Sequence, residues 1–355
     1  MTMAQTYIVD AANGPGTNFT DLPAAVATVP DGAVLEVRAG NYSGFAITNK
    51  GMSVLFASGA RIQSPVSTSG PLWVDIQGTG PSQTVLLRGL QIAPYVWLSS
   101  YWSLSNCQGL VLLKDLSPGG TPPGLMTANC RQVAVARCNL GDDVSCHVGA
   151  ILTNSNVVFR SCHMAWVSAT SCQLQFLDSF VSSLGCGYPS IAPAIQMNGG
   201  DTRIQAGSST ASAFNASVAG NGVLRVDPSA TLGWPTYPPI QPTYLEMPAV
   251  AATGGSLGGS VTTTVRGPTG DVGALLVGLL GPPLQFPGFA DALWLQPGTE
   301  SVCTFAAFTA GTPLTVTYAV PNVQAIRGLR LCWHGVSFGA TNGLQASNPA
   351  ITTHW

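Results

Sequence analysis

Charge is what this sequence has least of. Only 8% of its 355 residues are charged, with 13 basic and 15 acidic side chains and a formal net charge of −2. A typical globular protein carries about 25% charged residues, and exposed helix faces use many of them. The shortage therefore argues against a helical protein and predicts a mostly β chain. The near-zero net charge also excludes the basic footprint expected of a nucleic-acid-binding protein.

Long hydrophobic runs and metal-binding motifs are also absent. The longest apolar run, residues 272–280, is about half the length that a membrane span needs. None of the nine cysteines forms a Cys-x-x-Cys pair, so neither a zinc nor a thiol-redox motif is predicted. No cofactor is expected, and Ca²⁺ is left open because no dense acidic loop marks a site for it.

No signal peptide is visible at the start of the sequence. Residues 1–5 are interpreted as the remnant left where one has been removed. On this hypothesis the protein is secreted and works outside the cell or at the cell surface.

What the chain has instead is 41 Gly, 26 Pro and a repeat between residues 84 and 205. Each copy has a small polar pair, then an aliphatic strand, then a polar turn. The pairs begin 23, 25 and 17 residues apart and are Asn106-Cys107, Asn129-Cys130, Asn154-Ser155 and Ser171-Cys172. Such repeats are typical of solenoids, in which each unit buries its apolar face against the next. We expect the three asparagines to stack as an internal hydrogen-bonded ladder.

The cysteines allow two interpretations. Equivalent positions of a solenoid stack about 4.8 Å apart, which is within the Cα range of a disulfide. Cys107–Cys130 and Cys138–Cys162 bridges are therefore one expectation, and columns of free, buried thiols are an equal alternative. A Cys303–Cys332 bridge is a further hypothesis, and it would indicate an oxidising compartment.

The entrance of the chain gives a recognisable order of signals. A strand and a Gly/Pro loop precede a helix with Thr20 at its N-cap, which Pro30-Asp31-Gly32 ends; a second strand and the turn Gly40-Asn41-Tyr42 follow. This order resembles the entrance of the pectin-lyase-like right-handed parallel β-helix superfamily. The resemblance is close over residues 7–45 and, through the repeats, looser to about residue 235. It implies that the short helix caps the open apolar end of the solenoid.

The resemblance implies a fold rather than one activity. The superfamily includes lyases, hydrolases, esterases, epimerases, phage tailspikes and non-enzymatic surface proteins. The paired Asp, Gln and Arg-Pro-Trp elements of the pectin methylesterases are missing here.

A proline-rich stretch separates the repeats from a region of different texture. Residues 249–355 contain five strand-like runs at the spacing of a β-sandwich. The sequence thus predicts an all-β chain with a right-handed parallel β-helix and N-terminal capping helix over residues 1–235. A linker at 236–248 and a small antiparallel β-sandwich accessory domain at 249–355 complete it.

One candidate catalytic cluster contains two adjacent acids. Asp142 and Asp143, with His147 nearby, have the composition of the carboxylate pairs that cleave polysaccharides or hold a metal against a uronate. Gly141-Asp142-Asp143 resembles the Asp-Asp element of the polygalacturonase-like hydrolases, but that family's Asn-Thr-Asp, Gly-His-Gly and Arg-Ile-Lys elements are missing. The alternative, which we favour, is a plain turn over residues 139–143.

A second candidate cluster is basic. The residues that recur near the ends of successive strands are Arg88, Lys114, Arg137 and Arg160, and His163 and Asp178 follow in later turns. If they share one outer column, they form a strip for acidic sugars, and Lys or Arg can take the proton alpha to a uronate carboxylate. The favoured alternative is solvated charge at strand ends, because a register slip of one residue reverses the face of a side chain.

Aromatic residues concentrate in one long connection. They are Tyr95, Trp97, Tyr101 and Trp102. Such a patch either serves as a platform for stacking sugars or packs the connection against the solenoid.

We therefore expect an extracellular carbohydrate-active protein that binds or cleaves a polysaccharide, as a lyase or a glycoside hydrolase. The residues expected to be catalytic are Asp142, Asp143, His147, Arg160, His163 and Asp178. Those expected to bind substrate are Trp97, Tyr101, Trp102, Lys114 and Arg137. The rival hypothesis is a non-enzymatic surface, adhesive or self-assembling protein, because low net charge favours association.

Overall fold

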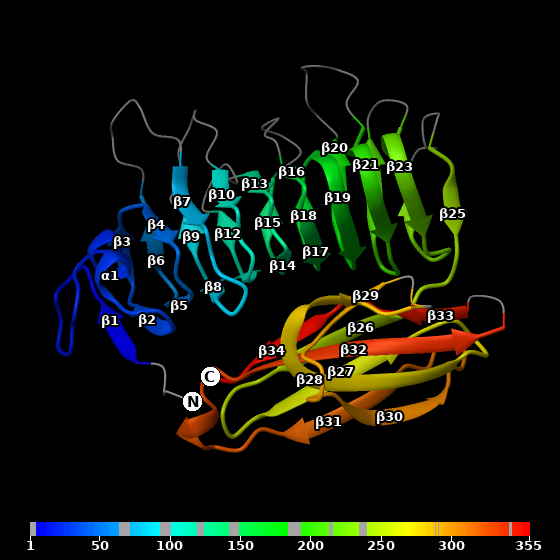
Figure 1. Cartoon of the computed structure of the whole chain (residues 1–355). Coiled ribbons are helices and arrows are strands. Elements are labelled where there is room, and N and C mark those ends of the chain that lie inside the picture. Colours follow the sequence, from blue (N-terminus) through cyan, green and yellow to red (C-terminus); the bar gives the residue numbers. More distant parts are fainter. Residues whose placement is uncertain are drawn as a thin grey trace. The chain divides into compact units, whose positions relative to one another are not determined.

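Two compact units make up the chain. The computed structural model describes residues 5–63, 72–92, 101–118, 124–141, 149–183, 193–212, 216–233, 240–287, 289, 291–340 and 343–355. One unit contains Thr2–Arg225 with Ala230–Thr243, and the other contains Val226–Ser229 with Tyr244–Trp355. The first is a parallel β-helix and the second contains antiparallel sheets, so the predicted fold class is confirmed (Figure 1). Neither described helix is long and apolar enough to cross a membrane.

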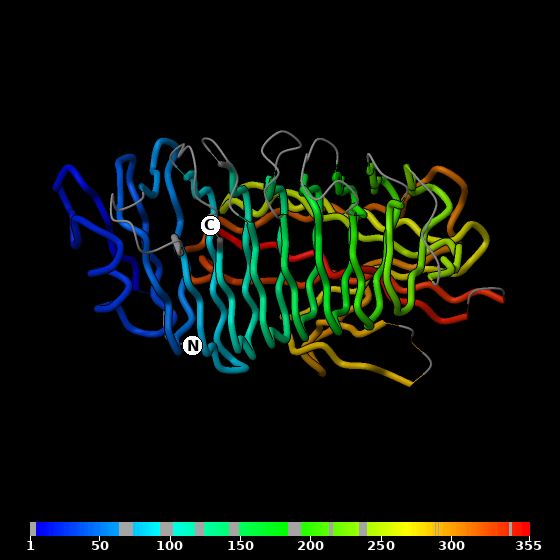
Figure 2. Tube along the Cα trace, turned by 90° about the horizontal axis from the view of Figure 1, so that it is seen from above, coloured from blue at the N-terminus to red at the C-terminus, as the bar shows by residue number. Residues whose placement is uncertain are grey.

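Each turn of the β-helix supplies strands to three faces, called here the first, second and third in chain order. Figure 2 shows successive turns lying side by side from blue to green. The first face contains β1 (Thr6–Val9), β2 (Ala33–Val37), β5 (Met52–Phe56), β8 (Thr84–Arg88), β11 (Leu110–Lys114), β14 (Gln132–Ala136) and β17 (Asn156–Arg160). The second contains β3 (Gly40–Tyr42), β6 (Ala60–Ile62), β9 (Gln91–Ile92), β12 (Ser117–Pro118), β15 (Asn139–Leu140), β18 (His163–Met164), β20 (Phe180–Ser183), β22 (Ser209–Ser212) and β24 (Thr231–Leu232). The third contains β4 (Phe45–Thr48), β7 (Leu72–Gln77), β10 (Tyr101–Ser105), β13 (Gly124–Ala128) and β16 (Ala150–Thr153).

The later strands are long enough to serve two faces. In β19 (Val167–Leu177) the first residues pair with β16 and the last pair with β17, so the strand bends from the third face to the first. The sheet then continues through β21 (Ile195–Ile204), β23 (Val218–Val226) and β25 (Pro242–Tyr244).

Strand alternation builds the core of the β-helix. Parallel pairing puts Val85, Val111 and Val133 in one column, and all three are 0% exposed. Further along, Phe159 and Phe176 stack with their ring centroids 5.2 Å apart. Each buried aliphatic side chain contributes about 1.5–3 kcal/mol, so turn-on-turn stacking of apolar residues stabilises the unit. The β-branched residues also suit the extended backbone.

The predicted helix is present, with a different cap. Helix α1 spans Leu22–Thr28, and its N-cap is Asp21 rather than Thr20. Oδ1 of Asp21 accepts hydrogen bonds from the backbone N–H groups of Leu22 (2.8 Å) and Ser43 (2.9 Å), so the acid joins the helix start to the next turn. The apolar face of α1 is buried and packs near β4.

The corner between the third and first faces repeats one backbone conformation. Asn106, Asn129 and Asn154 have φ values of 54°, 56° and 46°, in the left-handed region that Asn tolerates better than most residues. Nδ2 of Asn129 donates to Oδ1 of Asn106 (3.1 Å), and Nδ2 of Asn154 donates to Oδ1 of Asn129 (3.2 Å). The predicted ladder is confirmed, but it is not internal. It runs along the exposed outside of the corner, because the left-handed residue turns its side chain outward.

The residue after each left-handed asparagine points inward. Sγ of Cys130 donates to the carbonyl oxygen of Ala128 (3.5 Å), and Oγ of Ser155 donates to that of Thr153 (2.7 Å) in the next turn. Cysteine and serine therefore play one role, which is to satisfy the carbonyl two residues back. The seven cysteines that the structure describes are free, so the proposed Cys107–Cys130 and Cys138–Cys162 bridges are wrong and the free-thiol alternative is correct.

The second unit packs two antiparallel sheets around one core. One sheet contains β26 (Ala249–Gly254), β27 (Ser260–Arg266) and β31 (Leu314–Ala319). The other contains β28 (Val272–Gln285), β29 (Ala292–Leu295), β30 (Ser301–Ala307), β32 (Arg330–Gly339), β33 (Gly343–Ala346) and β34 (Ala350–Thr353), and a short 3-10 helix η1 spans Gln324–Ile326. Val250 and Val261 from the first sheet meet Leu275 and Trp333 from the second in the core.

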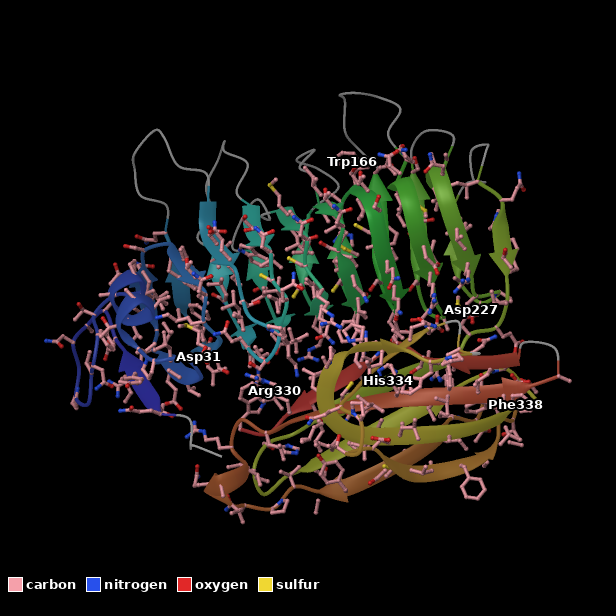
Figure 3. The ribbon with its side chains drawn as sticks, viewed as in Figure 1. Asp31, Trp166, Asp227, Arg330, His334 and Phe338 are labelled. Carbon is pink, nitrogen blue, oxygen red and sulfur yellow. The ribbon has the colours of Figure 1, made fainter. Side chains whose placement is uncertain are left out.

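Two residues of β32 show how polar side chains are accommodated in this core. His334 is fully buried; its Nε2 accepts the N–H of Trp294 (2.9 Å), and burial lowers its pKa to about 3, so it is a neutral structural residue (Figure 3). Cys332 and Cys303 lie on strands that pair with opposite edges of β28, and both are free. The Cys303–Cys332 bridge is therefore wrong, because a whole strand separates the two thiols.

The left-handed corner generates a testable prediction at Asn129. An alanine in this conformation costs about 1–2 kcal/mol, whereas glycine adopts it freely. The ladder bonds are exposed and contribute less than the backbone term. We expect Asn129→Ala to reduce the free energy of unfolding by about 1–2 kcal/mol more than Asn129→Gly does, in urea denaturation. Asn156→Ala, on a neighbouring strand, is the control and should cost less than Asn129→Ala; an alanine variant as stable as the glycine variant would contradict the argument.

Candidate functional site

The corner between the first and second faces brings the predicted basic residues together. Arg88 pairs in register with Lys114, Lys114 with Ala136, and Ala136 with Arg160. Because Leu113, which precedes Lys114, points into the core, these four positions form one outward column at the end of the first face. Arg137 is one residue further along, at the corner itself. Three of the four predicted basic residues therefore share a column, and the fourth lies beside it.

This corner is the most regular part of the β-helix. From β8 to β20, every connection between the first and second faces has two residues, and they are Gly89-Leu90, Asp115-Leu116, Arg137-Cys138, Ser161-Cys162 and Asp178-Ser179. The first residue of each has a positive φ, from 47° at Asp178 to 79° at Gly89. The second is buried. The charged side chains at this corner are thus held on a repeating backbone rather than on a loop.

Asp115 organises two of the cations. Its Oδ2 accepts a hydrogen bond from Nε of Arg88 (3.2 Å) in the preceding turn, and its Oδ1 pairs with Arg137 (2.6 Å) in the following turn. The arginine side chains are 39% and 46% exposed, so each pair contributes less than about 1 kcal/mol. The importance of Asp115 is geometric, because one carboxylate fixes guanidinium groups on either side of its own turn.

Lys114 is the unusual cation of the column. Burial, together with the neighbouring charges of Arg137 and Arg88, lowers its pKa to about 8. Among the described residues, no carboxylate lies within ion-pair distance of its Nζ atom. Burial also lowers the pKa of Arg160, which the charge of Asp178 opposes.

The second face adds an aromatic pair next to the basic column. Asn139, His163 and Phe180 follow one another in register on β15, β18 and β20. The His163 and Phe180 rings stack 5.2 Å apart and within 7° of parallel. Both side chains are half-buried. Of the predicted residues, Lys114, Arg137, Arg160, His163 and Asp178 thus lie at or beside this one corner over successive turns.

Most of the other predicted site residues fall outside the part of the chain that the structure describes. Asp142, Asp143, His147 and Trp97 lie outside the described residues, as does the side chain of Tyr101. Trp102 pairs in register with Val74 and Leu125 in the inward column of the third face and is 1% exposed. Its ring is not exposed to solvent, so of the two interpretations of the aromatic residues, packing against the solenoid fits Trp102.

Sequence reasoning passed over several residues that shape this site. Asp115 and Ala136 could not be recognised without the register, and Phe180 carries no signal beyond its place in a strand. Trp166 lies in the two-residue connection between β18 and β19 and is half-buried (Figure 3). It lies two residues after the short strand that contains His163, at the opposite end of the second face from the basic residues.

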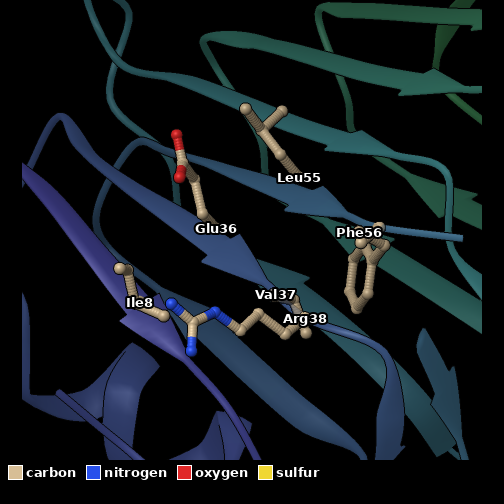
Figure 4. A pocket seen from close by; sticks show the side chains of 7 residues that line it. Ile8, Glu36, Val37, Arg38, Leu55 and Phe56 are labelled. Carbon is tan, nitrogen blue, oxygen red and sulfur yellow. The ribbon is translucent and has the colours of Figure 1, made fainter. Parts of the chain in front are cut away.

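One hollow lies near the start of the first face (Figure 4). It has a volume of about 360 Å³ and is lined by Ile8, Glu36, Val37, Arg38, Leu55, Phe56 and Ala57. Its cation, Arg38, is paired with Asp10 at 2.8 Å. Nowhere in the described part of the chain are three His, Cys, Asp or Glu side chains grouped so that they could hold a metal ion.

Comparison with known proteins assigns this chain to no family. No protein-family model matches it, and no curated protein matches it. Among solved structures, it is similar to the enzymatically active domain of tailspike protein 4 of bacteriophage CBA120, with 11% identity, a TM-score of 0.34, and coverage of 91% of this chain and 64% of that one.

Two further tailspike structures are also similar. Tailspike protein 2 of an Escherichia coli bacteriophage has 10% identity, a TM-score of 0.22, and coverage of 95% of this chain and 65% of that one. A tailspike of Acinetobacter baumannii bacteriophage Fri1, described as a capsular polysaccharide depolymerase, has 10% identity, a TM-score of 0.19, and coverage of 98% and 82%. The chain spans less than two thirds of the length of the first two. The fold is assigned from the strand pairing of the chain itself.

The low pKa of Lys114 generates a prediction with a definite sign. Its folded pKa of about 8 lies below the ordinary value near 10.4, so the unfolded chain binds the extra proton between these values and the folded protein gains stability as pH rises through them. Below pH 8 the full free-energy cost of burying the charged Lys114 side chain is present. We expect Lys114→Met to be more stable than the wild type at neutral pH by about 1–3 kcal/mol, with the difference shrinking towards pH 10. Lys114→Arg, which stays charged, is the control. A stability difference between Lys114→Met and the wild type that does not change with pH would contradict the lowered pKa of Lys114.

Proposed function

We propose that the β-helix unit binds an acidic polysaccharide along the basic corner, defined as Arg88, Lys114, Arg137 and Arg160 with Asp115. The observation that carries the proposal is the register that aligns Arg88, Lys114 and Arg160 in one outward column with Arg137 beside it. Successive turns of a β-helix are about 4.8 Å apart, which is close to the length of one sugar in an extended glycan. An extended chain of acidic sugars therefore matches cations presented turn by turn.

The basic column has a defined end on each side, so it would bind a glycan segment of defined length. Leu55 occupies the equivalent position before Arg88, and Leu177 occupies it after Arg160. In a protein with only 13 basic residues, four of them lie at this corner. Such a concentration is expected of a binding surface, because scattered solvated charge has no reason to keep one register.

The described residues suit a lyase better than a hydrolase. A glycoside hydrolase needs two carboxyl groups across the scissile bond, one of them protonated. Asp115 is instead held by ion pairs with two guanidinium groups, those of Arg88 and Arg137, and is not paired with a second carboxyl group. A lyase needs a base for the proton alpha to a uronate carboxylate, and an amine with a pKa of about 8 between guanidinium groups suits that step. In the proposed reaction the neutral amine of Lys114 takes the C5 proton, the C5–H electron pair forms the C4=C5 double bond, and the C4–O bond breaks. The leaving oxygen takes a proton from water, and the hydroxide that remains is neutralised by the proton on Lys114.

The test uses a panel of uronate-containing and neutral polysaccharides. We expect the wild type to bind the uronate polymers, more weakly as salt rises, and to release unsaturated products faster as pH rises through about 8. Lys114→Arg should retain binding and lose the unsaturated product, whereas Arg88→Gln combined with Arg137→Gln should weaken binding at least tenfold. Equal binding of neutral polymers, or unchanged product release by Lys114→Arg, would overturn the binding or the lyase part respectively.

Self-association is a second candidate function, favoured by a different observation in the second unit. Phe305 is 74% exposed, Phe338 62% and Val272 55%. Val272 pairs with Phe338, and Phe305 pairs with Ala274, so the three side chains lie on one side of neighbouring strands. Large apolar side chains gathered on one surface mark an interaction site more often than single ones do.

This candidate predicts concentration-dependent assembly. We expect the sedimentation coefficient of the wild type to rise with protein concentration, and the rise to be lost in Phe305→Ser combined with Phe338→Ser. Polysaccharide binding should not change in this variant. Thr315→Ser combined with Thr317→Ser, on exposed positions of the other sheet, is the control. A wild type that stays monomeric at all concentrations would exclude the candidate.

A further inference from the structure

The basic column contains one gap, at Ala136. Lys114 and Arg160 lie two turns apart, and the residue between them in register is an alanine. We infer that the space over Ala136 is a subsite for one carboxylate group of an acidic sugar, with Lys114, Arg137 and Arg160 around it. This inference rests on the proposed function and adds the position and chemistry of one bound group.

Backbone geometry defines the size of the gap. Two turns separate the Cα atoms of Lys114 and Arg160 by about 9–10 Å, and Ala136 places a single methyl group between their side chains. Because Leu113, Val135 and Phe159 are buried, the column positions that follow them all point outward. Ala136 therefore fills less of the space between the two cations than a longer side chain at that position would.

Arg137 closes one side of the gap. It follows Ala136 at the corner and its guanidinium reaches back to Asp115, in the turn of Lys114, at 2.6 Å. Its charge acts on both Lys114 and Arg160, whose pKa values it lowers. Three cations thus surround one alanine. Asp115 pairs with Arg88 and Arg137, and the charge of Asp178 acts on Arg160, so Lys114 is the member of the three without an ion-pair partner among the described residues.

An anion over Ala136 relieves a repulsion that the folded protein otherwise carries. Lys114 has no ion-pair partner among the described residues and is partly removed from water. Charge pairs interact more strongly at such sites than on an open surface. The alternative role of Ala136 is simple spacing, in which the small residue separates two like charges and binds nothing. The two roles predict different responses to an added carboxylate.

The test places a carboxylate in the gap in two ways. Sodium glucuronate is titrated into the full-length protein against glucose, sodium sulfate and sodium chloride at matched ionic strength, and binding and thermal unfolding are measured. We expect glucuronate to bind the wild type and to raise its unfolding midpoint, and glucose to do neither. Ala136→Glu should raise the midpoint without any ligand and weaken glucuronate binding at least tenfold. Ala136→Gln, of the same size but neutral, should weaken binding equally without raising the midpoint.

A matched control variant lies on the third face. Ala128 also ends a strand, is also half-exposed, and has the uncharged neighbours Ser105 and Thr153 in register. Ala128→Glu should leave glucuronate binding unchanged and should not raise the unfolding midpoint. If an Ala136 variant fails to fold, Lys114→Met provides the second test, because it should also lose glucuronate binding.

The outcomes separate this inference from the proposed function. If the wild type binds a uronate polysaccharide and both Ala136 variants bind it equally well, the subsite is overturned and the proposed function stands. If glucuronate binding is lost in both variants but no polysaccharide binds, the subsite stands and the proposed function is overturned. A response to sulfate without one to glucuronate, or a midpoint that rises equally in Ala136→Glu and Ala136→Gln, overturns the carboxylate assignment.

Discussion

In-register parallel pairing of successive turns is the constraint on which the β-helix unit depends. Hydrophobic stacking along the axis favours it, since a shift of one residue would turn Val111 and its neighbours out of the interior of the β-helix. The same register gives every other position its neighbours one turn away. It aligns the asparagine ladder, repeats the thiol or hydroxyl that satisfies a backbone carbonyl, and places Lys114 between Arg88 and Ala136. The candidate site is therefore a consequence of core packing rather than an addition to it.

The fold was accessible from the sequence because the residues that build it are local and repeated. The paired Asn-Cys phrases and the helix near the entrance led to the β-helix, and the ladder of Asn106, Asn129 and Asn154 was anticipated. Errors arose where one residue decides the geometry. Thr20 and Asp21 are both good N-caps, and only the backbone shows that Asp21 has the extended conformation. Neighbouring cysteines allow either bridges or free thiols, and the carbonyl partner of each thiol is set by the corner.

The candidate site was only partly accessible, for a related reason. The repeats are unequal in length, so aligning them does not determine which basic residues share a column. In the structure Arg88, Lys114 and Arg160 do, whereas Arg137 is offset by one position. Asp115 gains its role from contacts with residues 27 positions before it and 22 positions after it, as the hydrogen bonds to Arg88 and Arg137 show. Such long-range contacts leave no local pattern in a single sequence.

The unequal lengths of the repeats arise mainly at one corner of the β-helix, between the second and third faces. Between the second and third faces, the connection from β15 to β16 takes residues 141–149, whereas that from β18 to β19 takes two residues. The basic corner, by contrast, keeps its two-residue connection from β8 to β20. Insertions and deletions can therefore accumulate at one edge during evolution without altering the spacing of cations at another. This fold can therefore diversify the segments that it displays at one corner while it preserves a fixed set of charges at another.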